Sequence, residues 1–172
     1  MPMLEGLMSQ AGLKWSDLRM LALGVGPGSF TGLRIAAATF SGINASLSLP
    51  TLPVSSLAIT AAQTDSSEAL WVLEDARAGE VFVGHYQAHS AIEEDRCMSW
   101  EALQEMSASK YVAVSTPPED LSGWQQLERP IARPEALACV VQELLKSVKV
   151  EALSRYVQPA YLQITQAERN LK

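Results

Sequence analysis

A near-continuous apolar run followed by a glycine-rich loop is the feature that most constrains the fold of this chain. Residues 20–25 read Met-Leu-Ala-Leu-Gly-Val, which is typical of a parallel strand that is buried on both faces. The loop Gly26–Gly32 follows, and residues 33–40 open a long helix of small side chains that Pro50 is expected to end. A strand, a tight loop and a helix in this order predict an α/β fold.

The segments on either side extend this pattern. Residues 4–13 carry apolar side chains at helical spacing, and residues 51–54 predict a second buried strand. Ser55 or Ser56 is placed to cap a short helix that runs to Gln63. The order αβαβα therefore covers the first third of the chain.

A polar break over residues 63–68 predicts a boundary between two units, 1–64 and 65–172. Beyond it the pattern changes to a hairpin, followed by shorter elements. The expected elements are strands 69–76 and 80–86, a helix capped by Ser99, a strand 110–114, a loop 116–133, a helix from Pro134 to 148 and an extended segment 156–162.

Charge and composition exclude several classes of function. Thirteen basic and nineteen acidic residues give a net charge of −6, and no Lys/Arg cluster is present to bind nucleic acid unaided. No apolar stretch approaches the length that crosses a bilayer. Cys97 and Cys139 lie far apart and outside metal-type spacing, and no leader is evident, so we expect a reduced, cytoplasmic protein.

The loop after the first strand is the strongest candidate for a binding site, because backbone N–H groups converge where a strand gives way to a helix. It is not a P-loop, since no Lys follows at the required spacing, and it lacks the third glycine of a dinucleotide fingerprint. These residues alone do not distinguish between two interpretations of the loop, a structural turn and a binding loop. The candidate residues are Gly26, Pro27, Gly28, Ser29, Phe30, Thr31, Gly32 and Arg34.

Two further groups of polar residues are weaker candidates. Around the hairpin turn lie Asp75, Arg77, Gly79 and Glu80, where an Asp–Arg pair that fixes the turn is favoured over catalysis. His85 and His89 lack a third ligand, so we expect solvated side chains and no metal there. Three of the four tryptophans, Trp71, Trp100 and Trp124, are expected to be packing residues. No cofactor is expected.

Four sequence blocks resemble the bacterial TsaB (YeaZ) family and occur in the family's order: 13–38, 50–57, 75–82 and 159–162. The first, with Gly-Val-Gly-Pro-Gly-Ser-Phe-Thr-Gly-Leu-Arg-Ile, is the most specific. The resemblance implies an α/β, actin-like and Hsp70-like fold of two lobes, each with an RNase H-like sheet. It also implies a role in making N6-threonylcarbamoyladenosine beside the tRNA anticodon. The implied role is a non-catalytic subunit that binds the paralogous transferase TsaD and recruits the ATPase TsaE, touching tRNA only through the complex.

The resemblance also identifies positions that argue against catalysis. The catalytic paralogue holds a metal with two histidines one helical turn apart, and aligning on Val54 places these positions at Ser56 and Thr60, whose hydroxyls are poor ligands. The alternative is a metal-dependent threonylcarbamoyl transferase or M22-type peptidase. An actin-like sugar or acetate kinase and a homodimer with a separate regulatory role are further alternatives.

In this family two helices form the surface that meets TsaD or a second copy. The corresponding residues here predict an apolar patch on the first helix and on one edge of the long helix. The patch consists of Leu4, Leu7, Met8, Ile35, Thr39 and Ile43.

The resemblance further implies that the first lobe is incomplete. Family members have three strands, with an Ile-Asp-Thr-Ser motif, before the helix at residues 4–13. A truncated product and a misassigned start are the two explanations. Either one leaves open strand edges that invite association, and makes actin-like ATP binding improbable.

Overall fold

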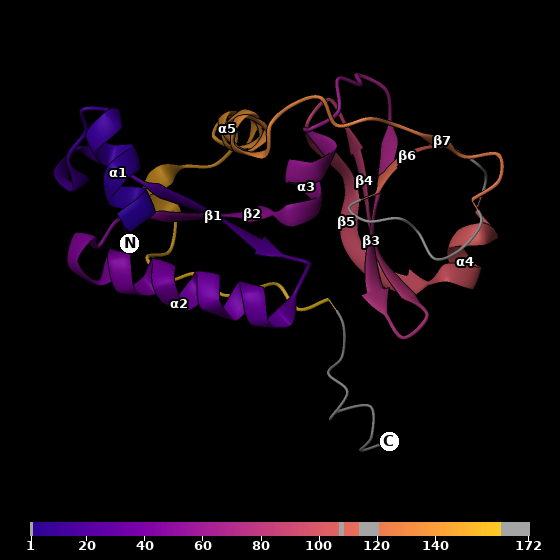
Figure 1. Ribbon diagram of the computed structural model, residues 1–172, viewed down its shortest axis with the longest axis horizontal. Helices are drawn as coiled ribbons and strands as arrows, with labels where there is room; N and C mark the ends of the chain where they lie inside the picture. The colour runs from indigo at the N-terminus through magenta and orange to yellow at the C-terminus, as the bar shows by residue number, and fades with distance from the viewer. Residues whose placement is uncertain (1, 107–108, 114–120, 163–172) are drawn as a thin grey trace, which may run out of the picture.

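The computed structural model describes residues 2–106, 109–113 and 121–162, which form two sheets with helices between and around them (Figure 1). A two-stranded parallel sheet has the order β1-β2, and a five-stranded mixed sheet has the order β5-β4-β3-β6-β7. The elements are α1 (Pro2–Gln10), η1 (Trp15–Asp17), β1 (Leu21–Gly26), α2 (Phe30–Leu47), β2 (Thr51–Ser55), α3 (Ser56–Ala61), β3 (Leu70–Arg77), β4 (Glu80–Gln87), β5 (Ser90–Ser99), α4 (Trp100–Gln104), β6 (Lys110–Ala113), β7 (Gln125–Gln126), α5 (Arg133–Leu144) and η2 (Val150–Ala152).

The predicted α/β order of the first third is confirmed. β1 pairs with β2 in parallel, with Leu21 opposite Thr51. Ser55 is the cap of α3, since its Oγ accepts from the backbone N–H groups of Leu57 and Ala58. The helix α2 ends three residues before Pro50, where Ser48 takes a left-handed conformation with φ 53°.

The expectation that β1 is buried on both faces is wrong. Leu21, Leu23 and Val25 are only partly buried. The physical reason is the size of the sheet. Among the described residues β1 has a neighbouring strand on one edge only, and a two-stranded sheet is too small for helices to cover both of its faces.

The predicted hairpin is confirmed and extended. β3 and β4 pair antiparallel, with Leu70 opposite Tyr86. β5, which the sequence did not predict, pairs antiparallel with β4 and makes the outer edge of the sheet. The predicted strand is confirmed over Lys110–Ala113, and residue 114 lies outside the described residues. The predicted helix is confirmed at its start beside Pro134, but it ends at Leu144 and not at residue 148. Part of the predicted loop 116–133 lies outside the described residues, and no strand forms over 156–162.

The core has two parts, one on each face of the five-stranded sheet. The larger part lies between this sheet and the helices α3 and α5, and Leu57 of α3 is fully buried there. The smaller part lies between the other face and α4, and contains Trp71, Trp100 and Leu103. These burials agree with the expectation that the tryptophans are packing residues. Figure 1 shows α3 between the small sheet and the large one.

The last described segment returns to the first sheet. The backbone N–H of Thr51 donates to Ser154 O at 2.8 Å, and that of Ala160 donates to Val25 O at 2.8 Å. The side-chain amide of Asn44 donates to Arg155 O at 2.9 Å. The division into units 1–64 and 65–172 stays a prediction, and residues 154–160 pack on elements of the first unit.

Candidate functional site

The loop between β1 and α2 is shaped by its own glycines and by the cap of α2. The peptide bond between Gly26 and Pro27 is cis. Gly26 has φ +113°, and a side-chain carbon there would lie 2.8 Å from Leu33 and 3.1 Å from Ala160 O. Ser29 caps α2, with its Oγ 3.3 Å from the N–H of Gly32. Each of these contacts gives a residue of the motif a role in holding the conformation of the loop.

A carboxylate faces this loop, which disfavours an anion there. A side-chain carbon at Gly28 would lie 3.3 Å from Oε1 of Glu74 on β3. Burial raises the pKa of Glu74, while the nearby Arg133 guanidinium acts in the opposite direction. A phosphate placed at Gly28 would meet this carboxyl group, so the geometry favours the structural interpretation of the loop over the binding one.

The other end of the motif forms an exposed aromatic and cationic cluster. The guanidinium of Arg34 lies over the ring of Phe30, 4.2 Å from its centroid. The Phe30 and Tyr161 rings are 5.4 Å apart, and Arg34 Nε donates to the Tyr161 hydroxyl at 3.4 Å. These contacts join the first and last of the sequence blocks that the family resemblance uses.

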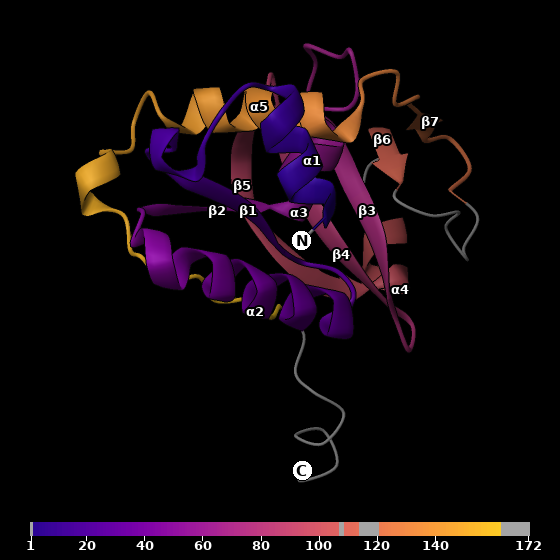
Figure 2. The ribbon, with the colours of Figure 1, turned by 60° about the vertical axis from the view of Figure 1, so that its left-hand side comes forward.

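The residues predicted for a partner surface lie on two helices that bury almost nothing. Among their described residues α1 buries none and α2 buries only Asn44. Leu7 is 60% exposed and Ile35 is 62% exposed, whereas Met8 and Ile43 are half-buried. In Figures 1 and 2 the first turn of α1 lies toward α2.

A shallow depression of about 540 Å³ brings part of this surface together. Thr39 and Ile43 line it with Trp15 of η1, and the wall is completed by small or apolar residues of α2. The sequence reasoning missed Trp15, because its place beside α2 depends on how the α1–η1 segment folds back. The lining residues are Trp15, Ala38, Thr39, Gly42, Ile43, Ser46 and Leu47.

Ser56 and Thr60 lie one helical turn apart on α3, and their surroundings do not suit a divalent cation. Thr60 is fully buried, and its hydroxyl donates to the backbone carbonyl of Ser56 at 3.1 Å. Arg133 Nη1 lies 3.5 Å from the same hydroxyl, which places a positive charge where a metal would have to bind. Over the described part of the chain, no cluster of three or more His, Cys, Asp or Glu side chains forms a candidate metal site.

The hairpin turn and the histidines have structural contacts. Asp75 Oδ1 accepts from the backbone N–H of Arg77 at 2.8 Å, so the carboxylate fixes the turn through the backbone rather than through the guanidinium. Gly79 continues the turn with φ +79°, and Glu80 begins β4. His85 stacks on Trp71 with ring centroids 4.1 Å apart. It also contacts Glu93 at 3.1 Å, and this hydrogen bond is the main cause that lowers the pKa of Glu93. His89 lies apart in the next turn with φ +72°.

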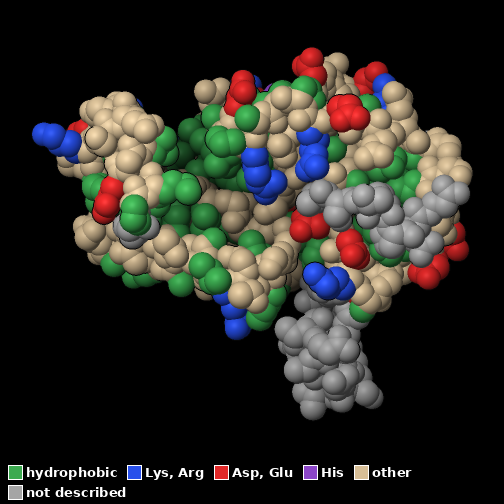
Figure 3. Space-filling model, in the orientation of Figure 1, with side chains coloured by type: hydrophobic (Ala, Val, Ile, Leu, Met, Phe, Trp, Pro, Cys, Tyr) green, Lys and Arg blue, Asp and Glu red, His purple; other side chains and the backbone are tan. Residues whose placement is uncertain are grey.

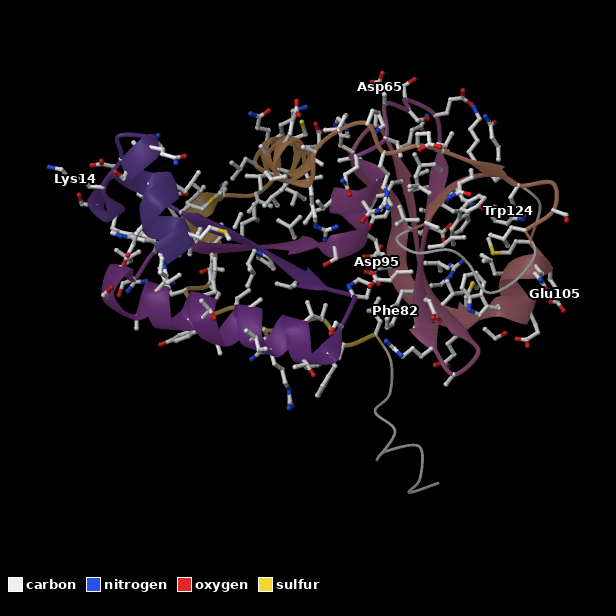
Figure 4. All side chains as sticks on the ribbon, viewed as in Figure 1. Lys14, Asp65, Phe82, Asp95, Glu105 and Trp124 are labelled. Carbon is white, nitrogen blue, oxygen red and sulfur yellow. The ribbon has the colours of Figure 1, made fainter. Side chains whose placement is uncertain are left out.

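A three-residue cluster that the sequence did not predict ties β2 to the large sheet. Asp95 of β5 accepts from Ser55 Oγ and from the Tyr86 hydroxyl, both at 2.5 Å. A side-chain carbon at Gly84 would collide with the Tyr86 ring and with Asp95 Oδ1, so the cluster would have to shift to admit one. Asp95 lies between α3 and the five-stranded sheet (Figure 4). No sequence signal distinguishes Asp95 from the exposed acidic residues beside it.

The stability of Asp95→Asn, measured against that of the parent protein at the same pH, is expected to increase as pH rises. Burial raises the pKa of Asp95, so the folded protein binds this proton more tightly than the unfolded chain does. The stability linked to the proton is fully present below the unfolded pKa and is lost as pH rises through the raised folded pKa. Urea unfolding from about pH 4 to about pH 8 measures the difference between Asp95→Asn and the parent protein.

The control for this prediction is Glu94→Gln, which alters an exposed carboxylate next along the same strand. For this variant the difference in unfolding free energy is expected to stay constant over the same range. The upward direction assigned to the pKa of Asp95 would be contradicted if the unfolding free energy of Asp95→Asn, relative to that of the parent protein, stayed constant or fell as pH rises.

Two solved structures share this architecture. One is described as an uncharacterized protein with similarity to peptidase YeaZ from Pseudomonas aeruginosa, and it matches with a TM-score of 0.69 and 26% identity. The other is described as YeaZ from Pseudomonas aeruginosa, with a TM-score of 0.70 and 27% identity. Each match covers 94% of this chain and 82% of the solved one. The fold is therefore of the actin-like, RNase H-like α/β class.

A family model described as "TsaD: tRNA N6-adenosine threonylcarbamoyltransferase" matches residues 1–120. The chain belongs to this family. Similar curated proteins are named "tRNA threonylcarbamoyladenosine biosynthesis protein TsaB". The one from Haemophilus influenzae is 26% identical over 94% of this chain and 77% of its own length. The one from Escherichia coli is 36% identical over 51% of this chain and 39% of its own length. These relatives agree with the resemblance on which the sequence analysis relied.

No helix in the described residues is both long and apolar enough to span a bilayer.

Proposed function

We propose that this chain is a non-catalytic subunit in the synthesis of N6-threonylcarbamoyladenosine in tRNA, acting in the cytoplasm by binding the transferase TsaD. Recruitment of the ATPase TsaE is part of the same proposal. The observation that carries it is the apolar surface of α1 and α2, on which large side chains such as Leu7 and Ile35 face solvent. Surfaces of this kind are typical of protein–protein interfaces.

The depression beside Ile43 supports the choice of a protein partner over a small ligand. It is open and shallow, and its lining holds no charged side chain to orient a substrate. A bulky apolar side chain of a partner fits against Trp15 and the small residues of α2. The tRNA would then be contacted through the complex, in keeping with the net charge of −6.

The alternative, a metal-dependent transferase or M22-type peptidase, finds less support in these residues. The two positions that would hold the metal carry hydroxyls, and one of them lies beside the Arg133 guanidinium. The family description names a transferase, so the alternative is tested directly by the experiment below.

The test is an omission series with TsaD, TsaE, a threonylcarbamoyl-adenylate source and unmodified tRNA. Formation of modified adenosine is expected in the full mixture, and it is expected to be lost when either TsaD or this chain is left out. Product formed without TsaD would favour the enzymatic alternative. Equal yield without this chain would overturn the proposed function.

A further inference from the structure

A groove of about 450 Å³ lies between the edge strand β5, the end of α5 and the junction of β2 with α3. Its apolar surface comes from Pro53, Ala58, Val140 and Leu144. None of its lining residues belongs to α1, β1 or α2, so it is separate from the hydrophobic hollow over β1 in Figure 3. This β5–α5 groove is therefore a second surface, independent of the one that carries the proposed function.

Three consecutive carboxylates of β5 line the β5–α5 groove, namely Glu93, Glu94 and Asp95. In a regular strand, the side chains of successive residues point to opposite faces. The register of β5 on β4 shifts near Gly84, so Glu94 and Asp95 together lie opposite that one residue. This bulge explains how the three carboxylates reach one groove. It also makes the edge of β5 a poor template for another strand, which favours recognition through side chains.

The charges in the β5–α5 groove are unbalanced. Glu143 of α5 adds a fourth carboxylate, and it is paired at 2.5 Å with Lys146, the only lysine or arginine among the described lining residues. Glu93 is paired with Arg96 at 2.6 Å. Glu94 is exposed, and no described residue forms an ion pair with it. A cation therefore complements the groove, whereas an anion would be repelled.

Asp95 is half-buried in the groove, and its hydrogen bonds decide what kind of cation fits. One oxygen accepts from Ser55 Oγ and the other from the Tyr86 hydroxyl, both at 2.5 Å. Burial raises the pKa of Asp95 despite these bonds, so a cation beside it would favour the ionised form. Because each oxygen already accepts a hydrogen bond, bidentate pairing with arginine is disfavoured, whereas a single ammonium group needs only one remaining lone pair.

We propose that the β5–α5 groove binds a lysine side chain on an exposed segment of a partner protein. The apolar side chains along the groove contact the methylene stem, and Glu94 and Asp95 contact the ammonium group. The volume suits one such side chain, since it lies near the lower end of the range for small-ligand sites, about 300–1,000 Å³. Ile92 and Leu145, from the two segments that border the groove, are 49% and 37% exposed and offer contacts to the residues around the lysine. These contacts favour a protein segment over a free amine.

The test uses the 172-residue chain, labelled with ¹⁵N, and the capped tripeptide Val-Lys-Val. The amide signals of Ala91, Glu94 and Ser147 are expected to shift on titration with this peptide, because these residues line the groove. The matched peptide Val-Gln-Val, which lacks the ammonium group, is expected to leave them unchanged. The amine n-butylamine has the ammonium group and the stem alone, and it is expected to bind about fivefold more weakly than the peptide.

Two variants test the assignment of the carboxylate. Glu94→Gln is expected to raise the dissociation constant of Val-Lys-Val about fivefold, since it removes the exposed carboxylate of the groove. The control is Glu101→Gln, which removes an exposed carboxylate of α4 outside the groove. Its dissociation constant is expected to stay within about twofold of that of the parent chain.

Four results would overturn the proposal. The first is the absence of a shift at the three amides, and the second is equal binding of Val-Lys-Val and Val-Gln-Val. The third is an equal loss of affinity in Glu94→Gln and Glu101→Gln, which would show attraction to the net charge of the chain rather than to the groove. The fourth is binding of n-butylamine as tight as that of the peptide, which would assign the groove to a small amine.

Discussion

Replacing Ile43 with Glu is expected to weaken binding to TsaD at least tenfold, or about 1.4 kcal/mol. Ile43 is half-buried at the edge of the depression that Trp15 and Thr39 share. A partner that covers this depression must remove the new carboxylate from water, and the lining holds no basic side chain to pair with it. Titration calorimetry of TsaD with each variant measures the change in dissociation constant.

The matched control for Ile43→Glu is Ser41→Glu, which adds the same charge to an exposed position of α2 outside the depression. Its binding is expected to stay within about twofold of the parent chain, since rim charges act mainly on association rates. Unchanged binding by Ile43→Glu together with weakened binding by Ser41→Glu would place the interface on another face of the helix.

Leu57→Ala is expected to lower the free energy of unfolding by about 2–5 kcal/mol, the usual range for removing a fully buried leucine. Leu57 has no exposed surface and lies on α3, which contacts both β1 of the small sheet and β3 of the large one. Its truncation leaves a cavity where the two sheets join. Urea unfolding monitored by circular dichroism and by tryptophan fluorescence measures the loss.

The control for Leu57→Ala is Ile92→Ala on β5, where the side chain is 49% exposed and the expected loss is below about 0.5 kcal/mol. Both probes are expected to report one coincident transition for the parent chain. Two separate transitions, or a loss below about 1 kcal/mol for Leu57→Ala, would contradict the view that α3 joins the sheets.

The elements that were predicted correctly are those whose signals are local. The apolar run before Gly26, the serine caps of α3 and α4, and Pro134 at the start of α5 depend on neighbours within a few residues. The burial of β1 was predicted wrongly because it depends on how many strands join the sheet, which residues 20–25 do not encode.

The strand β5 was missed for a related reason. Residues 93–96 read Glu-Glu-Asp-Arg, a charge run typical of a solvated segment, yet the strand forms because it pairs with β4 at the edge of the sheet. Asp95 turns inward to Ser55 and Tyr86, whereas Glu94 faces solvent. Only the register on β4 distinguishes these two carboxylates.

The candidate site divides in the same way. The loop at Gly26 and the positions Ser56 and Thr60 were found through sequence motifs. Their charged neighbours, Glu74 beside the loop and Arg133 beside Thr60, are seen only in the structure. Trp15 could not be predicted, because more than twenty residues of chain separate it from the α2 residues that line the same depression, and no motif marks it.

The proposed function requires that this chain acts through a surface and contributes no reacting group. The most direct measurement is the yield of N6-threonylcarbamoyladenosine at fixed TsaD as the concentration of this chain is raised. The yield is expected to saturate near one chain per TsaD, and Ile43→Glu is expected to shift the curve to higher concentration with the same plateau. A yield that keeps rising with this chain after TsaD is removed would contradict it.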